Sequence, residues 1–447
     1  MPAAIMAAGA ILLGHALHIS NGFYDLTALS CLLLAILCCG IAALRLLPAR
    51  WQQSRDSTVI AILLSGIASN FIVLAVSEPG MYLAEPSPAQ HPLFIALLII
   101  AATFTACGAF GMRAFGMRRL WFPLTLGIFA ALGIWMIHAS PTPHVDVITV
   151  YESAWHALRH GKDPYTMTFP NIYSNNDLYP PGYVVAGRVL LGFPYPPLSL
   201  LLGLPGMIFG DVRYADVAAL IGTAAFIGYT RRNLIAPLAA VLLLSSPRAL
   251  FVIEQAWTEP LTLLTFGATI YFAVRQPRGW MLPISLGLLV ATKQYMIVAF
   301  PLAWLLTQPD QRIRDWVRLI IIASMAGAIV TLPFMFWNIG GFMKSVIALQ
   351  FQERFRLDSL SLLSWIHYSG IGTLTPERIL AASGLALIVT LIVSLWRASR
   401  TPAGFAAAIA LVLLCVFVSS KKAFCNYYFC GLGVMCASIA AQRPADD

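Results

Sequence analysis

The sequence predicts an all-α polytopic membrane protein. Of its 447 residues, 59% are hydrophobic and only 11% are charged, and the mean hydropathy is +0.79. Long apolar runs recur along the chain, and a helix of about 18 apolar residues or more can span a hydrocarbon core roughly 30 Å thick. These runs are continuous rather than alternating, which excludes the pattern of a transmembrane β-barrel. The composition also excludes a soluble domain of this size.

The charge and the cysteines agree with a membrane location. The formal net charge is +9, but most Lys and Arg residues fall in short loops, where they orient helices rather than bind nucleic acid. The 8 cysteines mostly lie in apolar runs, as Cys38 and Cys39 do, and are typical of small buried hydrophobic residues. The first 20 residues lack the basic segment that opens a secretory signal, so we expect them to form the first helix.

Four strong spans follow at residues 26–47, 57–76, 92–111 and 120–139. Arginines follow the first and the third of these, whereas the loop after the second carries acids and neither Lys nor Arg. The positive-inside rule therefore places the arginines in the cytoplasm. Alternation then puts residue 139 at the outer face, and residues 140–195 become the first large extracytoplasmic loop.

The middle of the chain contains a short Pro-rich segment at residues 192–210. We expect it to re-enter the membrane and return, because a full crossing would put Arg231 and Arg232 outside. Residues 280–307 are expected to form a hairpin of two helices that turns near Lys293. Further spans are predicted at residues 212–230, 233–246, 261–274, 319–337, 376–396, 403–419 and 423–441. The total is between a dozen and fifteen membrane segments.

The first outer loop begins with an amphipathic helix. Val147, Tyr151 and Ala154 follow the i, i+4, i+7 spacing of an apolar stripe, which favours a helix lying flat in the interface. Asp146 directly precedes the stripe, where a carboxylate can cap a helix, and Gly161 is placed to end it. Capping is therefore the alternative to a catalytic role for Asp146.

Polar residues expected at the outer face come from five loops, which together bring acids and bases to one side of the membrane. These residues are Asp146, Glu152, Lys162, Asp163, Glu254, Gln255, Glu259, Lys293, Gln294, Lys344, Glu353, Arg354, Arg356, Asp358, Lys421 and Lys422. Cations at such a face suit an anionic substrate that carries a phosphate. Simpler interpretations remain: Lys293 could reach back to the interface, Arg354 and Asp358 could form an i, i+4 ion pair, and Lys421 and Lys422 could contact lipid headgroups.

The loop also resembles a known family. An aspartate at the end of a span, a flat helix ending in Gly161 and Asp163-Pro164-Tyr165, and then Tyr195-Pro196-Pro197 are similar to the GT-C glycosyltransferases. The closest resemblance is to the polyprenyl-phosphate-dependent family 87, which includes bacterial mannosyl- and arabinosyltransferases. It covers roughly residues 120–440. Three features depart from the family. About five helices precede the aspartate instead of one, Tyr179-Pro180-Pro181 offers a second Tyr-Pro-Pro, and Glu254-Gln255 and Glu259 replace the family's Gln-rich motif.

The resemblance implies a GT-C-like helical bundle at residues 119–447, preceded by N-terminal transmembrane helices of unknown role at residues 1–118. It also implies inverting transfer of a sugar from a polyprenyl-phosphate donor to a glycan or glycolipid acceptor, at the outer side of a bacterial inner membrane. Asp146 would be the general base, and Lys293 and Arg356 would hold the donor phosphate. Arg354 and Lys421 are further candidates for binding this phosphate. The predicted substrate-shaping residues are Tyr165, Tyr195, Glu254 and Glu259. We expect no cofactor, and the sequence leaves a divalent metal open.

Two other functions remain compatible with the sequence. A transporter or flippase for a lipid-linked or small anionic substrate explains the many helices, the broken Pro-rich segment and the buried lysine. The chain could instead be a non-catalytic subunit of an envelope-polysaccharide assembly, and such a subunit would still form its complex after Asp146 is replaced.

Overall fold

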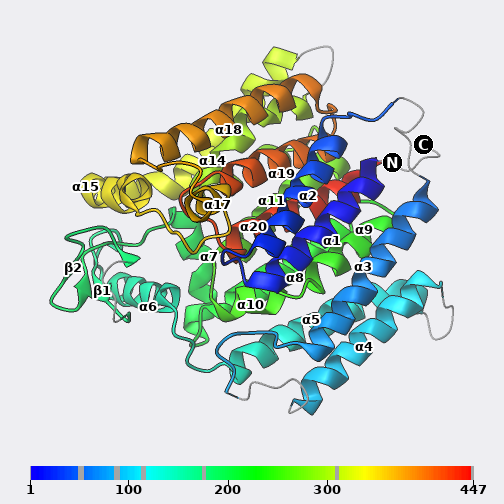
Figure 1. Ribbon diagram of the computed structural model, residues 1–447, viewed down its shortest axis with the longest axis horizontal. Helices are drawn as coiled ribbons and strands as arrows, with labels where there is room; N and C mark the ends of the chain where they lie inside the picture. The colour runs from blue at the N-terminus through cyan, green and yellow to red at the C-terminus, as the bar shows by residue number, and fades with distance from the viewer. Residues whose placement is uncertain are drawn as a thin grey trace.

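The computed structural model describes residues 2–48, 55–84, 91–111, 117–173, 178–307 and 312–443, and this part of the chain folds into a bundle of long helices (Figure 1). Seven of these helices are long and apolar enough to cross a membrane. They are α1 (Pro2–Ser20), α2 (Leu26–Ala43), α3 (Asp56–Val76), α4 (Pro92–Ala109), α5 (Met117–Ala139), α14 (Arg312–Trp337) and α18 (Pro376–Arg397). The predicted spans in these regions are confirmed as helices.

The remaining helices of the bundle are shorter and more buried. They are α8 (Arg213–Gly228), α9 (Ile235–Leu244), α10 (Ala249–Glu254), α11 (Glu259–Arg275), α19 (Pro402–Val418) and α20 (Cys425–Ala441). Nearly every residue of α19 and α20 is buried, whereas only 11% of the apolar stretch in α14 and in α18 is buried within the protein. Because α14 and α18 are apolar and exposed, they suit the lipid-facing surface of the bundle.

The N-terminal helices belong to the same core as the rest. Helix α1 packs against α2 and α20, α2 packs against α19, and α3 packs against α9. Their buried residues join one hydrophobic cluster that extends to Ala441. The hydrophobic core is therefore continuous across the predicted boundary at residue 118, and the helices on both sides of it pack in one bundle.

The Pro-rich segment forms α7 (Pro197–Ile208), which is about 18 Å long at 1.5 Å per residue and therefore too short to cross a bilayer. Its first turn contacts the tip of the later hairpin, where the Ser199 hydroxyl donates to the carbonyl of Thr292 at 2.7 Å. Beyond its other end, the Arg213 guanidinium donates to the carbonyl of Ser140, just after α5, at 2.7 Å. The segment thus begins deep in the bundle and returns to the end of α5.

The predicted hairpin is also present. Helix α12 (Met281–Val290) ends just before Lys293, and the chain returns through η5 (Gln294–Val298), α13 (Ala299–Leu302) and η6 (Ala303–Leu306). Lys293 lies in the turn between the two arms, with extended backbone (φ −148°). The hairpin therefore carries this lysine into the interior of the bundle, where it is 5% exposed.

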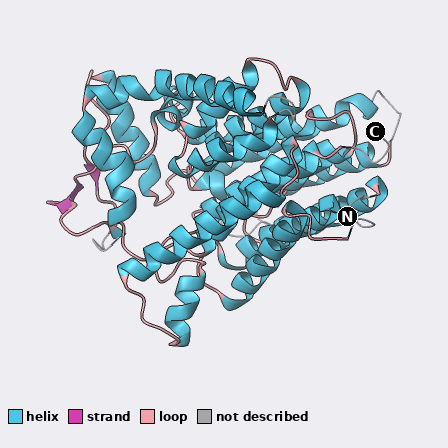
Figure 2. Ribbon diagram, turned by 90° about the horizontal axis from the view of Figure 1, so that it is seen from above, coloured by secondary structure: helices cyan, strands magenta, loops and turns pink. Residues whose placement is uncertain are grey.

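One end of the bundle carries additional short elements. They are α6 (Asp146–Arg159), β1 (Phe169–Pro170), β2 (Val184–Val185), β3 (Arg188–Val189), α15 (Ile339–Phe342), η7 (Met343–Ala348), α16 (Leu349–Gln352) and α17 (Leu362–Ser369). The three strands form an antiparallel sheet in the order β1-β3-β2, which the sequence did not predict, and Figure 2 shows them at one edge of the helices.

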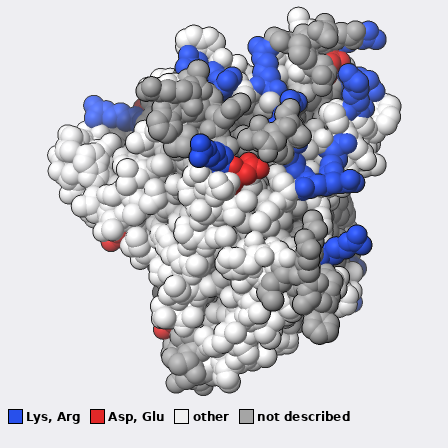
Figure 3. All heavy atoms as spheres, turned by 90° about the vertical axis from the view of Figure 1, so that its right-hand side faces the viewer, with Lys and Arg blue, Asp and Glu red and all other residues white. Residues whose placement is uncertain are grey.

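The opposite end is basic. Figure 3 shows Lys and Arg side chains gathered on the upper part of the face at the right of Figure 1, with few acidic side chains among them. Exposed arginines near helix ends include Arg45, Arg55, Arg119, Arg232 and Arg278. Arginines next to the ends of apolar helices are the residues that the positive-inside rule uses.

Candidate functional site

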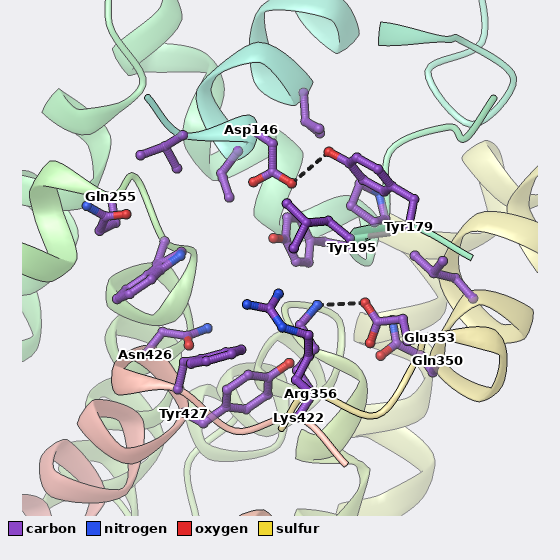
Figure 4. A pocket seen from close by; sticks show the side chains of 18 of the residues that line it. Asp146, Tyr179, Tyr195, Gln255, Gln350, Glu353, Arg356, Lys422, Asn426 and Tyr427 are labelled. Atoms are coloured by element: carbon purple, nitrogen blue, oxygen red, sulfur yellow. Dashed lines mark hydrogen bonds and ion pairs between the residues drawn. The ribbon is translucent and has the colours of Figure 1, made fainter. Parts of the chain in front are cut away.

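A cavity of about 690 Å³ lies between the additional elements and the helix bundle (Figure 4). Its size falls within the range of small-molecule sites. Apolar and aromatic side chains make up much of its wall, and five charged residues line it among the described ones. These are Asp146, Lys293, Glu353, Arg356 and Lys422. They come from four separate segments, since Glu353 and Arg356 share one, so only the folded chain brings them together.

Asp146 is the first residue of α6 and not its cap. The N-cap is Val145, which makes no side-chain cap bond, so the predicted capping role of Asp146 is wrong. Its carboxylate instead accepts a 3.0 Å hydrogen bond from the hydroxyl of Tyr179, and its backbone N–H donates to the hydroxyl oxygen of Tyr173 at 3.3 Å. Figure 4 shows the Asp146 side chain reaching the Tyr179 phenol across the upper wall of the cavity.

The phenol of Tyr179 is a stable proton donor. Burial, and then the charge of Asp146, raise the pKa of Tyr179 well above its ordinary value. Tyr179 therefore keeps its proton at neutral pH and donates it in a hydrogen bond to the carboxylate. In the described part of the chain Asp146 forms no ion pair, so this carboxylate is held by a neutral donor and not by a cation.

Helix α6 is anchored on its predicted apolar face. Val147, Tyr151 and Ala154 are buried, and the Tyr151 hydroxyl donates to the carbonyl of Ser199 on α7 at 3.0 Å. Gly161 follows the helix with φ +64°, and its N–H bonds the carbonyl of Leu158, as expected for a glycine that ends a helix. Helix α6 is thus anchored along its apolar face and ends at Gly161, which fixes the position of Asp146.

Lys293 is held in the interior and does not reach back to a surface. Its ammonium pairs with the Glu259 carboxylate at 3.0 Å, donates to the Thr258 hydroxyl and lies 4.3 Å from the centre of the Tyr195 ring. Glu259 is fully buried and also accepts a 3.1 Å hydrogen bond from the Asn426 amide. Since Lys293 lines the cavity and Glu259 does not, the carboxylate stands behind the ammonium.

Arg356 is arranged in a similar way. Its guanidinium binds the Asp358 carboxylate at 2.8 and 2.6 Å and stacks 4.8 Å from the centre of the Phe424 ring. Burial alone would raise the pKa of Asp358, but the Arg356 donors and charge outweigh it and hold that pKa below its usual value. Asp358 does not line the cavity, so this carboxylate also lies behind its cation.

Lys422 is the third cation of the cavity. Its ammonium pairs with the Glu353 carboxylate at 2.7 Å (Figure 4), and here both partners line the wall. Burial opposes the charged form of Lys422, but Glu353 more than compensates and raises the pKa of the lysine. The Lys422 ammonium therefore remains charged at neutral pH.

Two predicted phosphate-binding residues lie outside this cavity. Lys421 does not line it, and the Lys421 ammonium donates to the carbonyls of Phe351 and Glu353 at 3.1 and 2.7 Å. Arg354 is exposed and also lies outside the lining. The predicted Arg354–Asp358 pair is wrong, because residues 353–358 are not helical and Asp358 is engaged by Arg356.

The predicted substrate-shaping residues divide into one that lines the cavity and three that support it. Tyr195 lines the wall. Tyr165 is buried behind it, and the Tyr165 hydroxyl donates to the carbonyl of Tyr195 at 3.0 Å. Glu254 is fully buried and accepts from the backbone N–H groups of Met81 and Tyr82, at 2.6 and 2.8 Å. Glu259, as described above, supports Lys293.

Sequence reasoning missed two residues that the geometry brings forward. Tyr179 belongs to the second Tyr-Pro-Pro, which was visible as a repeat of the motif but had no assigned role. Lys422 was visible beside Lys421, and only the backbone direction after α19 decides which of the two ammonium groups reaches the cavity. Residue type alone does not indicate that Tyr179 contacts Asp146 or that Lys422, and not Lys421, lines the cavity.

Comparison with known proteins finds no matching family model, no matching curated protein and no matching solved structure. The class of the protein therefore rests on its own fold. Its seven long apolar helices and almost purely helical architecture define an α-helical polytopic membrane protein.

Proposed function

We propose that this protein is an integral-membrane glycosyltransferase. It moves a mannose-like sugar, or another hexose or pentose, from a polyprenyl-phosphate donor to an extracytoplasmic glycan or glycolipid acceptor, with inversion. The observation that carries the proposal is that a single cavity combines three cations with one carboxylate, Asp146, that is held by a phenol instead of by one of those cations. Asp146 is held by a neutral phenol, while Lys293, Arg356 and Lys422 each have a carboxylate partner of their own.

The chemistry needs both kinds of group. A sugar hydroxyl is a poor nucleophile at neutral pH, so Asp146 acts as the general base that takes its proton. The acceptor oxygen forms a bond to the anomeric carbon, and the bond from that carbon to the phosphate oxygen breaks. The leaving polyprenyl phosphate keeps the electron pair, and the cations stabilise its charge without a proton donor. Tyr195, beneath the Lys293 ammonium, offers an aromatic face to the sugar.

The membrane geometry supports the same proposal. The cavity lies at the end of the bundle opposite the basic face, so the positive-inside rule directs it away from the cytoplasm. Ile347 and Phe351 line the cavity and are also exposed, which leaves an apolar edge for a lipid chain. A bacterial inner membrane with the site facing the periplasm is the location that fits this proposal.

A transporter or flippase of a lipid-linked or small anionic substrate is the second candidate, and one observation favours it. Two interrupted segments meet inside the bundle, where the Leu198 N–H bonds the carbonyl of Ala291 at 3.2 Å beside the Ser199–Thr292 bond. Broken helices that meet in the bundle are common at transporter binding sites.

The test is sugar transfer by the purified full-length protein in lipid nanodiscs, supplied with labelled polyprenyl-phosphate sugars and candidate acceptors. Asp146→Asn keeps the size of the side chain and its bond to Tyr179 but removes the base. We expect transfer to fall by a factor of about 10² to 10⁴. Asp56→Asn, at the start of α3 and outside the cavity lining, is the matched control and should transfer like the wild type.

Equal transfer by the wild type and Asp146→Asn would exclude Asp146 as the base. Absence of transfer with every sugar, together with movement of lipid or solute across vesicles, would favour the transporter. Absence of both, with an intact complex of partner proteins, would favour an assembly subunit.

A further inference from the structure

The turn between α1 and α2 reaches the segment that carries Arg356. Phe23 in this turn forms an antiparallel β-bridge with Ser359. The N–H of Tyr24 donates to the carbonyl of Asp358 at 2.8 Å, and the N–H of Leu360 donates to the carbonyl of Gly22 at 3.2 Å. The N-terminal part of the chain is therefore bonded, through its backbone, to the residues next to a cavity cation.

This contact depends on a glycine. Gly22 has φ +81°, a left-handed conformation that L side chains rarely adopt. A Cβ atom at this position would lie 2.0 Å from the backbone nitrogen of Cys425, at the start of α20. The turn can approach α20 and the Arg356 segment this closely only because residue 22 has no side chain.

Side chains continue the contact into the cavity. The Phe23 ring packs edge-on against the Phe424 ring, with centroids 5.6 Å apart, and the Arg356 guanidinium lies 4.8 Å from the centre of the same Phe424 ring. Phe23, Phe424 and Arg356 all line the cavity. The guanidinium is therefore fixed by Asp358 on one side and by an aromatic pair on another, and the turn supplies one ring of that pair.

We propose that the α1–α2 turn is a positioning element of the donor-phosphate site, with Phe23 and Gly22 as its key residues. It holds the Arg356 guanidinium toward the cavity, so the N-terminal helices take part in binding the phosphate of the lipid donor. This inference rests on the proposed function for the identity of the ligand. It gives the segment at residues 1–118 a role, since α1 and α2 anchor the turn in the core through α19 and α20.

The experiment measures binding of polyprenyl phosphate without a sugar to the full-length protein in nanodiscs. We expect Phe23→Ala and Gly22→Ala to raise the Kd roughly tenfold, the loss of about one hydrogen bond to a charged group. Phe209→Ala and Gly384→Ala are the matched controls and should bind like the wild type. Phe209 is 79% exposed and outside the cavity lining, and a Cβ at Gly384 would contact nothing within 4 Å.

A double-mutant cycle separates positioning from general destabilisation. In an Arg356→Ala background, Phe23→Ala should cause no further loss of binding, because the group that it positions is gone. A loss of the same size with and without Arg356 would overturn the inference, and so would an unchanged Kd for Phe23→Ala or a wild type that does not bind polyprenyl phosphate. If the wild type binds with the expected cycle but transfers no sugar, this inference stands and the proposed transferase function fails.

Discussion

The Tyr179 hydroxyl donates a 3.0 Å hydrogen bond to the Asp146 carboxylate, although 33 residues separate them in the sequence. Asp146 begins α6 after a membrane helix, and Tyr179 belongs to the loop between β1 and β2 of the small sheet. The bond closes this loop over the cavity and fixes one carboxylate oxygen, which leaves the other to face a substrate hydroxyl.

Removal of the Tyr179 hydroxyl should impair catalysis more than it impairs folding. We expect Tyr179→Phe to lower kcat/KM about 10- to 100-fold, because a hydrogen bond to a charged group contributes about 1.5–3 kcal/mol. Tyr173→Phe is the comparison variant, since the Tyr173 hydroxyl accepts a 3.3 Å bond from the Asp146 backbone N–H. Steady-state transfer rates measure both variants, and an equal loss in the two would argue against a specific role for Tyr179.

The same phenol should make stability fall at high pH. The folded-state pKa of Tyr179 is raised above the ordinary value of 10.0 by burial and by Asp146. The stabilisation that its protonated form supplies is therefore fully present below about pH 10 and is lost as the pH rises toward the folded pKa. Unfolding followed from pH 9 to 11.5 should show the advantage of the wild type over Tyr179→Phe shrinking by at most about 1.4 kcal/mol per pH unit above pH 10. A constant difference over this range would show that Tyr179 ionises alike in both states.

The two neighbouring lysines after α19 should differ in function. Lys422→Gln should raise the KM for the donor about 10- to 100-fold, because the Lys422 ammonium lines the cavity and a charged hydrogen bond is lost. Lys421→Gln should change the donor KM less than about threefold, since Lys421 bonds two carbonyls outside the lining and a Gln amide can still donate one such bond. Transfer kinetics at varied donor concentration measure the donor KM of both variants. A larger increase for Lys421→Gln than for Lys422→Gln would show that Lys422 does not bind the donor phosphate.

Breaking the buried Lys293–Glu259 pair should destabilise the fold. Glu259→Gln leaves the ammonium of Lys293 without its carboxylate in the interior, which costs about 3–5 kcal/mol. Glu254→Gln is a control of equal burial, and because Glu254 accepts backbone N–H groups we expect a smaller cost of about 1–3 kcal/mol.

Unfolding by a denaturing detergent measures both losses. Lys293→Met should recover part of the loss in the Glu259→Gln background, because it removes the uncompensated charge. If the double variant is less stable than Glu259→Gln alone, the pair is not the source of the destabilisation.

Much of the helical framework could be predicted from the sequence. Residues 26–47 and 92–111 are long apolar runs, and a run of that kind in a membrane has no stable alternative to a helix. The amphipathic face of α6 and its end at Gly161 also followed from local spacing and from the conformational freedom of glycine. Such features depend on residues within a few positions of one another.

Pairing and orientation of side chains could not be predicted in the same way. Asp358 had two arginines within four residues, and the choice of Arg356 over Arg354 depended on the non-helical path of residues 353–358. Glu254 and Glu259 were both predicted to shape the substrate site. In the structure, Glu254 binds backbone N–H groups of the loop after α3, whereas Glu259 binds Lys293. The residues next to a carboxylate in the sequence do not predict which distant donor will bind it.

The sequence by itself determined the helical class of this protein, the position of its strongest spans and the segments that carry its polar residues, because hydrophobic length and periodicity act locally. Only the tertiary structure decided that Asp146, Lys293, Arg356 and Lys422 share one cavity, that Tyr179 holds Asp146 and that the α1–α2 turn bonds the Arg356 segment. These contacts join residues from tens to more than 300 positions apart, and they exist because tertiary packing brings distant backbones together, as the packing of α1, α2, α19 and α20 does for the α1–α2 turn.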